Sequence, residues 1–159
     1  MSAAHLPRWQ AALAAFAAAL WWGSLTTLGF FVVPMLFSKL ATPAMAGNMA
    51  AQLFAAQTWV SVACAMLLLL LLGVKKESNM PVAGVSYYFS ATIFVVAGML
   101  LALLVAFGVS PRIVARENLM LWHAVGSAMY LLQWLCAGFV LYKVTVLAQK
   151  KTDCRATSL

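Results

Sequence analysis

The chain has 159 residues, of which 65% are hydrophobic and only 8% are charged; its mean hydropathy is +0.97. A soluble domain carries about 25% charged residues on its surface, so this composition excludes an ordinary soluble protein and predicts an integral membrane protein. The net charge of +7 does not indicate nucleic-acid binding, because the basic residues stand at the ends of apolar runs, where they set membrane topology.

The first half of the chain predicts two membrane spans. An apolar run over about residues 9–33 has the length of a spanning helix, about 20 residues, and Pro34 is expected to end it. Pro43 follows a threonine, the pattern of an N-cap and a first helical residue. The helical pattern that starts there is too long for a hydrocarbon core of about 30 Å. We therefore expect an interfacial or strongly tilted helix segment, 43–55, that leads into a second span at 56–74.

The second half predicts two further spans and a polar tail. The third span covers about residues 82–108. Ser110 and Pro111 have the pattern of an N-cap and a first helical residue, so we expect the fourth helix to begin there and to cross the membrane over about 117–142. The tail, 149–159, is polar and is expected to be disordered. The predicted fold is all-α, a single transmembrane domain built as a four-helix bundle.

The distribution of basic residues predicts the orientation in the membrane. Seven basic residues fall on the side of the two termini and three on the opposite side, so both termini are expected to be cytoplasmic in a bacterial-type inner (plasma) membrane. Glycine and alanine faces favour helix contacts between copies. Besides the lipid bilayer, we therefore expect a homo-oligomer or another membrane protein as partner. The first group is Arg8, Lys75, Lys76, Lys143, Lys150, Lys151 and Arg155, and the second is Lys39, Arg112 and Arg116.

One face of the predicted fourth helix carries most of the candidate ligand-binding residues. His123 is an ionisable group inside a strongly apolar run, and such a group within a span is a functional candidate. Arginines of the same face suit an anionic ligand. At 100° per residue, six side chains fall within about 60° of one another, and Trp22 of the first span completes the candidate set. The six are Arg112, Arg116, His123, Ser127, Tyr130 and Trp134.

His123 is also the candidate ligand for a metal or a haem. One imidazole supplies one ligand, so a metal site would need methionine, cysteine or a partner subunit as well. The chain has no cysteine and histidine at zinc-ligand spacing, and no phosphate-binding or nucleophile motif. No motif therefore encodes a cofactor, and the sequence favours a protein without enzymatic activity.

Short motifs along about residues 9–147 resemble the transmembrane-protein-205-like family. The resemblance implies a four-span bundle in which the Pro34 turn, the Ala46-Gly47 stretch and His123 are shared positions. Bacterial members of that family have no assigned function, and its animal branch has been linked with resistance to metal-containing drugs. In the animal branch a glycine follows the histidine, whereas here Ala124 does. The motifs are Trp22-Gly23, Pro34-Met35-Leu36-Phe37, Ala46-Gly47, Leu53-Phe54, Arg116, Trp122-His123 and Ser127.

The sequence thus predicts a non-enzymatic membrane protein that binds or helps to pass a small molecule or a metal at an outward-facing site. His123, whose side chain is expected to look inward, would be the ligand or proton carrier, with Arg112 and Arg116 attracting an anion. Two alternatives remain open. The first is a haem-linked or redox membrane protein with His123 as axial ligand, and the second is a structural or assembly partner of another membrane protein.

Overall fold

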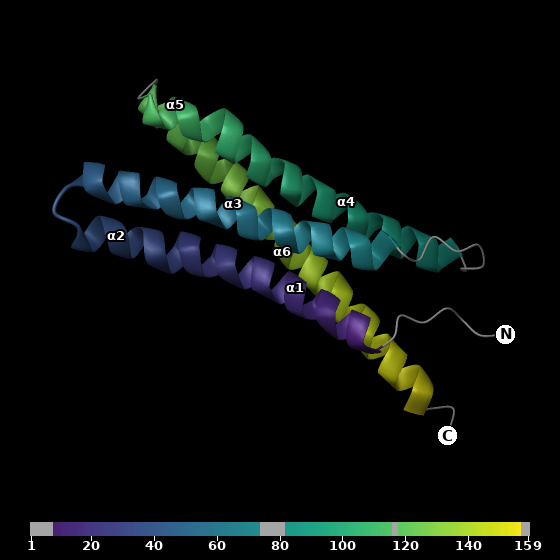
Figure 1. Cartoon of the computed structure of the whole chain (residues 1–159). Coiled ribbons are helices and arrows are strands. Elements are labelled where there is room, and N and C mark those ends of the chain that lie inside the picture. Colours follow the sequence, from purple (N-terminus) through teal and green to yellow (C-terminus); the bar gives the residue numbers. More distant parts are fainter. Residues whose placement is uncertain (1–7, 74–81, 116–117, 157–159) are drawn as a thin grey trace.

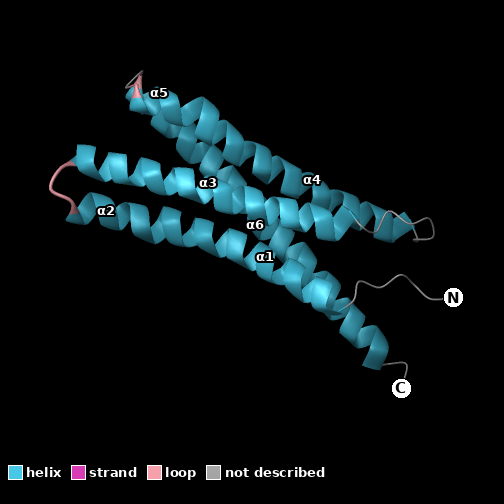
Figure 2. Ribbon diagram, in the orientation of Figure 1, coloured by secondary structure: helices cyan, strands magenta, loops and turns pink. Residues whose placement is uncertain are grey.

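The computed structural model describes residues 8–73, 82–115 and 118–156, which form helices joined by short turns, with no strand among them (Figures 1 and 2). Four stretches are long and apolar enough to cross a membrane: Trp9–Lys39, Pro43–Gly73, Phe89–Ile113 and Leu119–Val146. The predicted all-helical, four-span fold is therefore confirmed. The elements are α1 (Arg8–Thr27), η1 (Leu28–Val32), α2 (Val33–Lys39), α3 (Pro43–Gly73), α4 (Val82–Leu104), η2 (Val105–Val109), α5 (Ser110–Val114) and α6 (Leu119–Ala156).

The four spans run up and down in a bundle. Both α1 and α4 pack against α3 and α6. The start of α1 and the end of α6 lie at one end of the bundle, and the turns after α2 and α5 lie at the other (Figure 1). Large apolar side chains such as Phe16 and Phe107 point outward, with 74% and 70% of their surface exposed. An outer surface of this kind contacts the lipid bilayer, so the protein is a multi-pass membrane protein.

The centre of the bundle is filled by Trp21 of α1, whose side chain is completely buried. Its ring lies directly against Gly98 of α4, where an added Cβ would stand only 2.8 Å from the Trp21 Cη2 atom. A glycine is required here because any side chain would displace the indole from the core.

Two prolines that the sequence suggested as helix boundaries lie inside helical spans instead. The first span continues past Pro34 to Lys39, and the third continues past Pro111 to Val114. In both cases a π-helical segment precedes the proline, η1 in the first span and η2 in the third. Proline lacks an N–H, and its ring clashes with the carbonyl four residues earlier. A π-helical segment shifts the hydrogen-bond register within an α-helix, and in both spans the helix continues past the proline.

The boundaries of the other helices also differ from the expectation. Residues 43–55 are not separated from the second span, because α3 is one unbroken helix. The fourth helix begins at Leu119, not at Ser110, after a turn in which Asn118 has a positive φ of 35°. Asparagine tolerates this conformation better than most residues. At the other end α6 continues through Ala156, so most of the expected disordered tail is helical. That segment contains neither glycine nor proline to stop a helix.

Candidate functional site

The turn before α6 divides the face that the sequence predicted. Arg112 lies on α5, at the end of the third span, whereas His123 and the residues after it lie on α6. The turn nevertheless brings the two helices back together: the Arg112 Cζ atom stands 4.4 Å from the ring centroid of Trp122, the residue before His123. A guanidinium at this distance from an indole makes a cation–π contact. Arg116 lies outside the described residues.

His123 and Ser127 lie on the exposed side of α6. The imidazole was expected to face the interior of the bundle, and in the single chain it does not. Among the described residues, no three His, Cys, Asp or Glu side chains come together as metal ligands. A metal at His123 would therefore take its other ligands from methionine or from a second protein copy.

Tyr130 points from α6 into the first span, at the point where the first span changes from α-helical to π-helical hydrogen bonding. The Tyr130 hydroxyl donates a hydrogen bond of 2.7 Å to the carbonyl oxygen of Leu25. In an unbroken α-helix that carbonyl would accept from the N–H of Gly29, and Gly29 is the second residue of η1. A Cβ on Gly29 would meet the Tyr130 Cε1 atom at 2.6 Å. The glycine thus lets the phenol reach the helix break.

Two tryptophans of the predicted set, Trp22 and Trp134, contact each other one helical turn away from Tyr130. The Trp134 Nε1–H donates a 2.8 Å hydrogen bond to the Thr26 hydroxyl oxygen, and that hydroxyl donates to the carbonyl of Trp22 at 2.8 Å. The rings of Trp22 and Trp134 have centroids 5.7 Å apart. Phe30 approaches Trp134 from the other side, edge to face at 5.5 Å. Of the predicted residues, the structure therefore brings together Tyr130, Trp134 and Trp22 between the first span and α6.

The sequence analysis missed a chain of neutral polar groups inside the bundle. Gln133 Nε2 donates to the Ser61 hydroxyl at 3.1 Å, and this hydroxyl donates to the carbonyl of Gln57 at 3.0 Å. Gln57 Nε2 in turn donates to Ser24 Oγ at 2.9 Å. Gln133 and Ser61 are 3% and 0% exposed. An amide within an apolar span is a signal of the same kind as an ionisable residue, because both are polar groups that are costly to place in the membrane.

The amides and hydroxyls of this chain of hydrogen bonds can bind and orient a ligand. Amides, aliphatic hydroxyls and indoles do not ionise near neutral pH, so these groups offer no general acid or base. One fully buried side-chain donor among the described residues has no hydrogen-bond partner, the Nε1–H of Trp21. The arrangement is therefore suited to holding an uncharged molecule that forms hydrogen bonds.

Comparison with known proteins places the chain in one family. No curated protein and no solved structure matches the chain. Residues 16–120, more than half of the chain, match the family described as a domain of unknown function (DUF4149). The match covers most of the first span and all of the second and third. The chain belongs to this family, whose function is unknown.

Proposed function

We propose that this protein binds, or helps to pass, a small molecule within the membrane and that it does so without catalysing a reaction. It would work in a bacterial-type inner membrane with both termini in the cytoplasm and as part of an oligomer. The observation that carries the proposal is the contact of Tyr130 with the Leu25 carbonyl. A polar side chain from one span there enters the hydrogen-bond ladder of another, at a π-helical segment, and such segments occur frequently at functional sites.

The residues around this contact have the composition of a ligand site. Small-molecule sites combine aromatic walls with a few placed polar groups. Trp22, Trp134 and Phe30 supply aromatic rings, and the hydroxyls of Tyr130 and Thr26 supply the polar groups. These side chains are uncharged and half-buried for the most part, so they favour a neutral ligand or the neutral part of one.

The outward end of the bundle supports the role of an entrance. Arg112 and His123 are exposed, and Arg112 is held against Trp122. Arg116 belongs to the proposal by its position in the sequence alone, since it lies outside the described residues. Guanidinium groups bind phosphate or carboxylate through paired hydrogen bonds. An anionic group would therefore be attracted to this end before the rest of the molecule moved along α6 toward Tyr130.

The proposal is tested by the molecules that stay bound during purification. We expect wild-type protein in mild detergent to release one class of small molecule into organic solvent, in an amount comparable to the protein, as measured by mass spectrometry. Tyr130→Phe and Trp134→Phe should reduce that amount because they remove the hydroxyl and the indole N–H. Arg112→Ala and His123→Ala should reduce it if the entrance contributes to affinity.

Lys39→Ala is the matched control, since it removes an exposed basic residue from α2, on another span. Its content of bound molecule should equal that of the wild type. Equal content in the wild type and in all four variants, measured on folded protein of the same elution volume, would contradict the proposal. A wild type that carries no molecule other than bulk lipid would contradict it as well.

A metal- or haem-binding form of this function would use His123. The exposure of the His123 side chain supports the metal- or haem-binding form, because an exposed imidazole is accessible to ligands from a second copy. The relationship with the transmembrane-protein-205-like family, whose animal branch is linked with metal-containing drugs, is part of this second proposal. Visible absorbance in the Soret region, and metal content of wild type against His123→Ala, test it. A colourless protein with equal metal content in both would reject it.

A further inference from the structure

The two π-helical segments reveal that the chain repeats one plan twice. Both η1 and η2 have five residues, and each ends two residues before a proline. The pattern Phe-x-Val-x-Pro recurs at the same place, from Phe30 to Pro34 and from Phe107 to Pro111. A residue of the first span therefore corresponds to the residue 77 positions later, in the third span.

Burial follows the same correspondence. The buried positions of α4 are those that correspond to buried positions of α1. The connection from η2 to α6 is one residue shorter than that from η1 to α3, so the offset becomes 76 positions and Gln133 of α6 corresponds to Gln57 of α3. The two hairpins, α1 to α3 and α4 to α6, thus form a tandem pair of the same orientation, as in transporter folds built from parallel repeats. The buried pairs are Ala14/Ala91, Ala18/Val95, Trp21/Gly98, Leu25/Ala102, Gln57/Gln133, Ser61/Ala137, Cys64/Val140 and Leu68/Val144.

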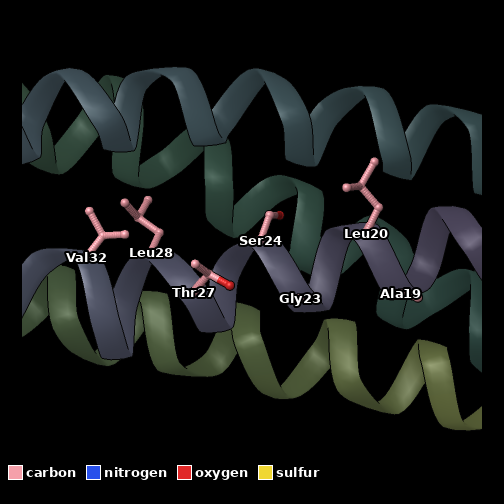
Figure 3. A pocket seen from close by; sticks show the side chains of 7 residues that line it. All are labelled: Ala19, Leu20, Gly23, Ser24, Thr27, Leu28 and Val32. Carbon is pink, nitrogen blue, oxygen red and sulfur yellow. The ribbon is translucent and has the colours of Figure 1, made fainter.

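The first hairpin has a groove along its outer wall. Its volume is about 450 Å³, and it is lined by seven residues of α1 and η1. Figure 3 shows Leu20 and Ser24 directed toward the neighbouring helix, while Gly23 leaves the wall between them open. The hydrogen bond from Gln57 to Ser24 identifies that helix as α3. Ser24 stands at the middle of the span Trp9–Lys39, so the groove reaches from mid-membrane toward the outward end.

The second hairpin provides an internal control for this groove. Four lining positions that are small or polar in α1 hold larger aliphatic residues in α4, while Leu20 is replaced by the smaller Ala97. Since the same hairpin packs with leucines at these places, packing alone does not require the small and hydroxyl-bearing residues of α1. The four pairs are Ala19/Val96, Gly23/Leu100, Ser24/Leu101 and Thr27/Leu104.

The groove's dimensions and chemistry select a class of occupant. A volume of about 450 Å³ lies within the range of small-molecule sites, roughly 300–1,000 Å³. Small residues at this spacing also suit a packed helix of a second copy, and the experiment below distinguishes that occupant from a small molecule. A lipid acyl chain would leave the Thr27 hydroxyl without a partner, and the leucines of α4 would suit it better. The Ser24 hydroxyl does not decide the choice, because it already donates to the Trp21 carbonyl at 3.0 Å and accepts from Gln57. Thr27 is exposed and makes no capping hydrogen bond.

From these observations we infer that the α1–α3 groove binds an uncharged molecule dissolved in the bilayer, apolar except for a carbonyl-type acceptor. The Thr27 hydroxyl donates to that acceptor, and the Ser24–Gln57 pair forms the polar end of the groove. The molecule enters sideways from the lipid. This inference rests on the proposed function in assuming that the protein binds small molecules, and it adds both a second face of α1 and the ligand's chemical class.

Benzophenone is a suitable probe, because it partitions into bilayers, carries a carbonyl and attaches to nearby C–H bonds on irradiation. The full chain in phosphatidylglycerol–phosphatidylcholine vesicles is irradiated with it, and labelled peptides are mapped by mass spectrometry. We expect labelling concentrated in residues 19–32. An excess of fluorenone, a ketone, should suppress this labelling more strongly than diphenylmethane, a hydrocarbon of similar size.

Gly23→Leu should reduce labelling of 19–32 to the level of α4, since a Cβ at Gly23 meets no atom within 4 Å and the side chain fills the groove without a clash. Thr27→Val should remove the advantage of fluorenone over diphenylmethane while the groove keeps its shape. Gly108→Leu is the matched control, because Gly108 is exposed and equally free of neighbours, and it should leave the labelling of 19–32 unchanged.

The outcomes separate this inference from the proposed function. Labelling spread evenly over all lipid-facing spans and unaffected by Gly23→Leu overturns the groove, even if Tyr130→Phe still releases a bound molecule. Labelling that Gly23→Leu abolishes and Tyr130→Phe does not affect supports the groove, even if no molecule depends on Tyr130. Loss of dimer in Gly23→Leu with unchanged labelling would show that a second copy occupies the face, and would also overturn the inference.

Discussion

The two helix breaks share a cause but differ in what holds them. Both accommodate a proline with five π-helical residues. The break in the first span is occupied by the Tyr130 hydroxyl, whereas the break in the third span is only packed: a Cβ on Gly126 of α6 would lie 3.3 Å from the Val109 Cγ1 atom. Each break therefore coincides with a proline, and we expect the neighbouring helix to determine how firmly the break is held.

Comparison of the two hairpins shows that the Tyr130 hydroxyl is present in the second hairpin and has no equivalent in the first. Tyr130 of α6 corresponds to Phe54 of α3, and the two rings meet edge to face at 5.3 Å. Phe54 has the same ring without the oxygen, so it supplies the aromatic packing that both hairpins share. The hydrogen bond to Leu25 is therefore specific to the break in the first span, where the proposed function places the ligand.

The largest expected effect comes from adding one methyl group at the first break. Gly29→Ala places a Cβ 2.6 Å from Tyr130 Cε1, and the phenol cannot move away without losing its hydrogen bond. We expect a loss of about 2 kcal/mol in unfolding free energy, the usual size for overpacking, measured by denaturant titration in micelles. Gly108→Ala, at the second break, should instead be neutral or gain about 0.5 kcal/mol from helix propensity. Equal losses of stability in Gly29→Ala and Gly108→Ala would contradict the expected difference between the two breaks.

A smaller effect is expected from removing the hydroxyl alone. Tyr130→Phe makes the first break resemble the second and leaves the Leu25 carbonyl without its donor. We expect a loss of about 1 kcal/mol in the same measurement, typical of one hydrogen bond. Tyr142→Phe removes the same atom from a residue of α6 that is 62% exposed, and its stability should equal that of the wild type. A Tyr130→Phe protein as stable as this control would show that the hydroxyl does not hold the break.

The fold could be predicted from the sequence to a large extent because hydropathy and length determine the spans. The number of spanning helices and their approximate centres follow from the apolar runs of the sequence. The boundaries did not follow, because the sequence signal of Pro34 and Pro111 is the same whether a helix ends or bends. Only the packing of the neighbouring spans, which continue alongside, favours the bend.

The candidate site could be predicted only in its inner half. Spacing along an ideal helix placed Tyr130 and Trp134 correctly, because both lie well inside α6. It failed for Arg112, since the turn at Asn118 puts that residue on another helix, and it gave the wrong orientation for His123. The amides Gln57 and Gln133 were missed because their partners, Ser24 and Ser61, are distant or on another helix, and no local pattern indicates such pairs.

The smallest expected effect concerns the prolines themselves. Pro111→Ala restores an N–H donor to a break that no side chain occupies, so the α-helical ladder can close, and amide hydrogen exchange over residues 105–112 should become slower. Pro34→Ala restores the same donor, but Tyr130 still occupies the Leu25 carbonyl, so exchange over residues 28–35 should change little. Neither substitution should alter the stability by more than about 0.5 kcal/mol, as is usual away from a packed or buried polar feature. If both segments gained the same protection, proline alone would cause both breaks, and the hydroxyl of Tyr130 would merely fill a space that the proline had opened. If only the third span changed, the hydrogen bond from α6 would be sufficient to keep the first span bent, which is the property a ligand site at that position requires.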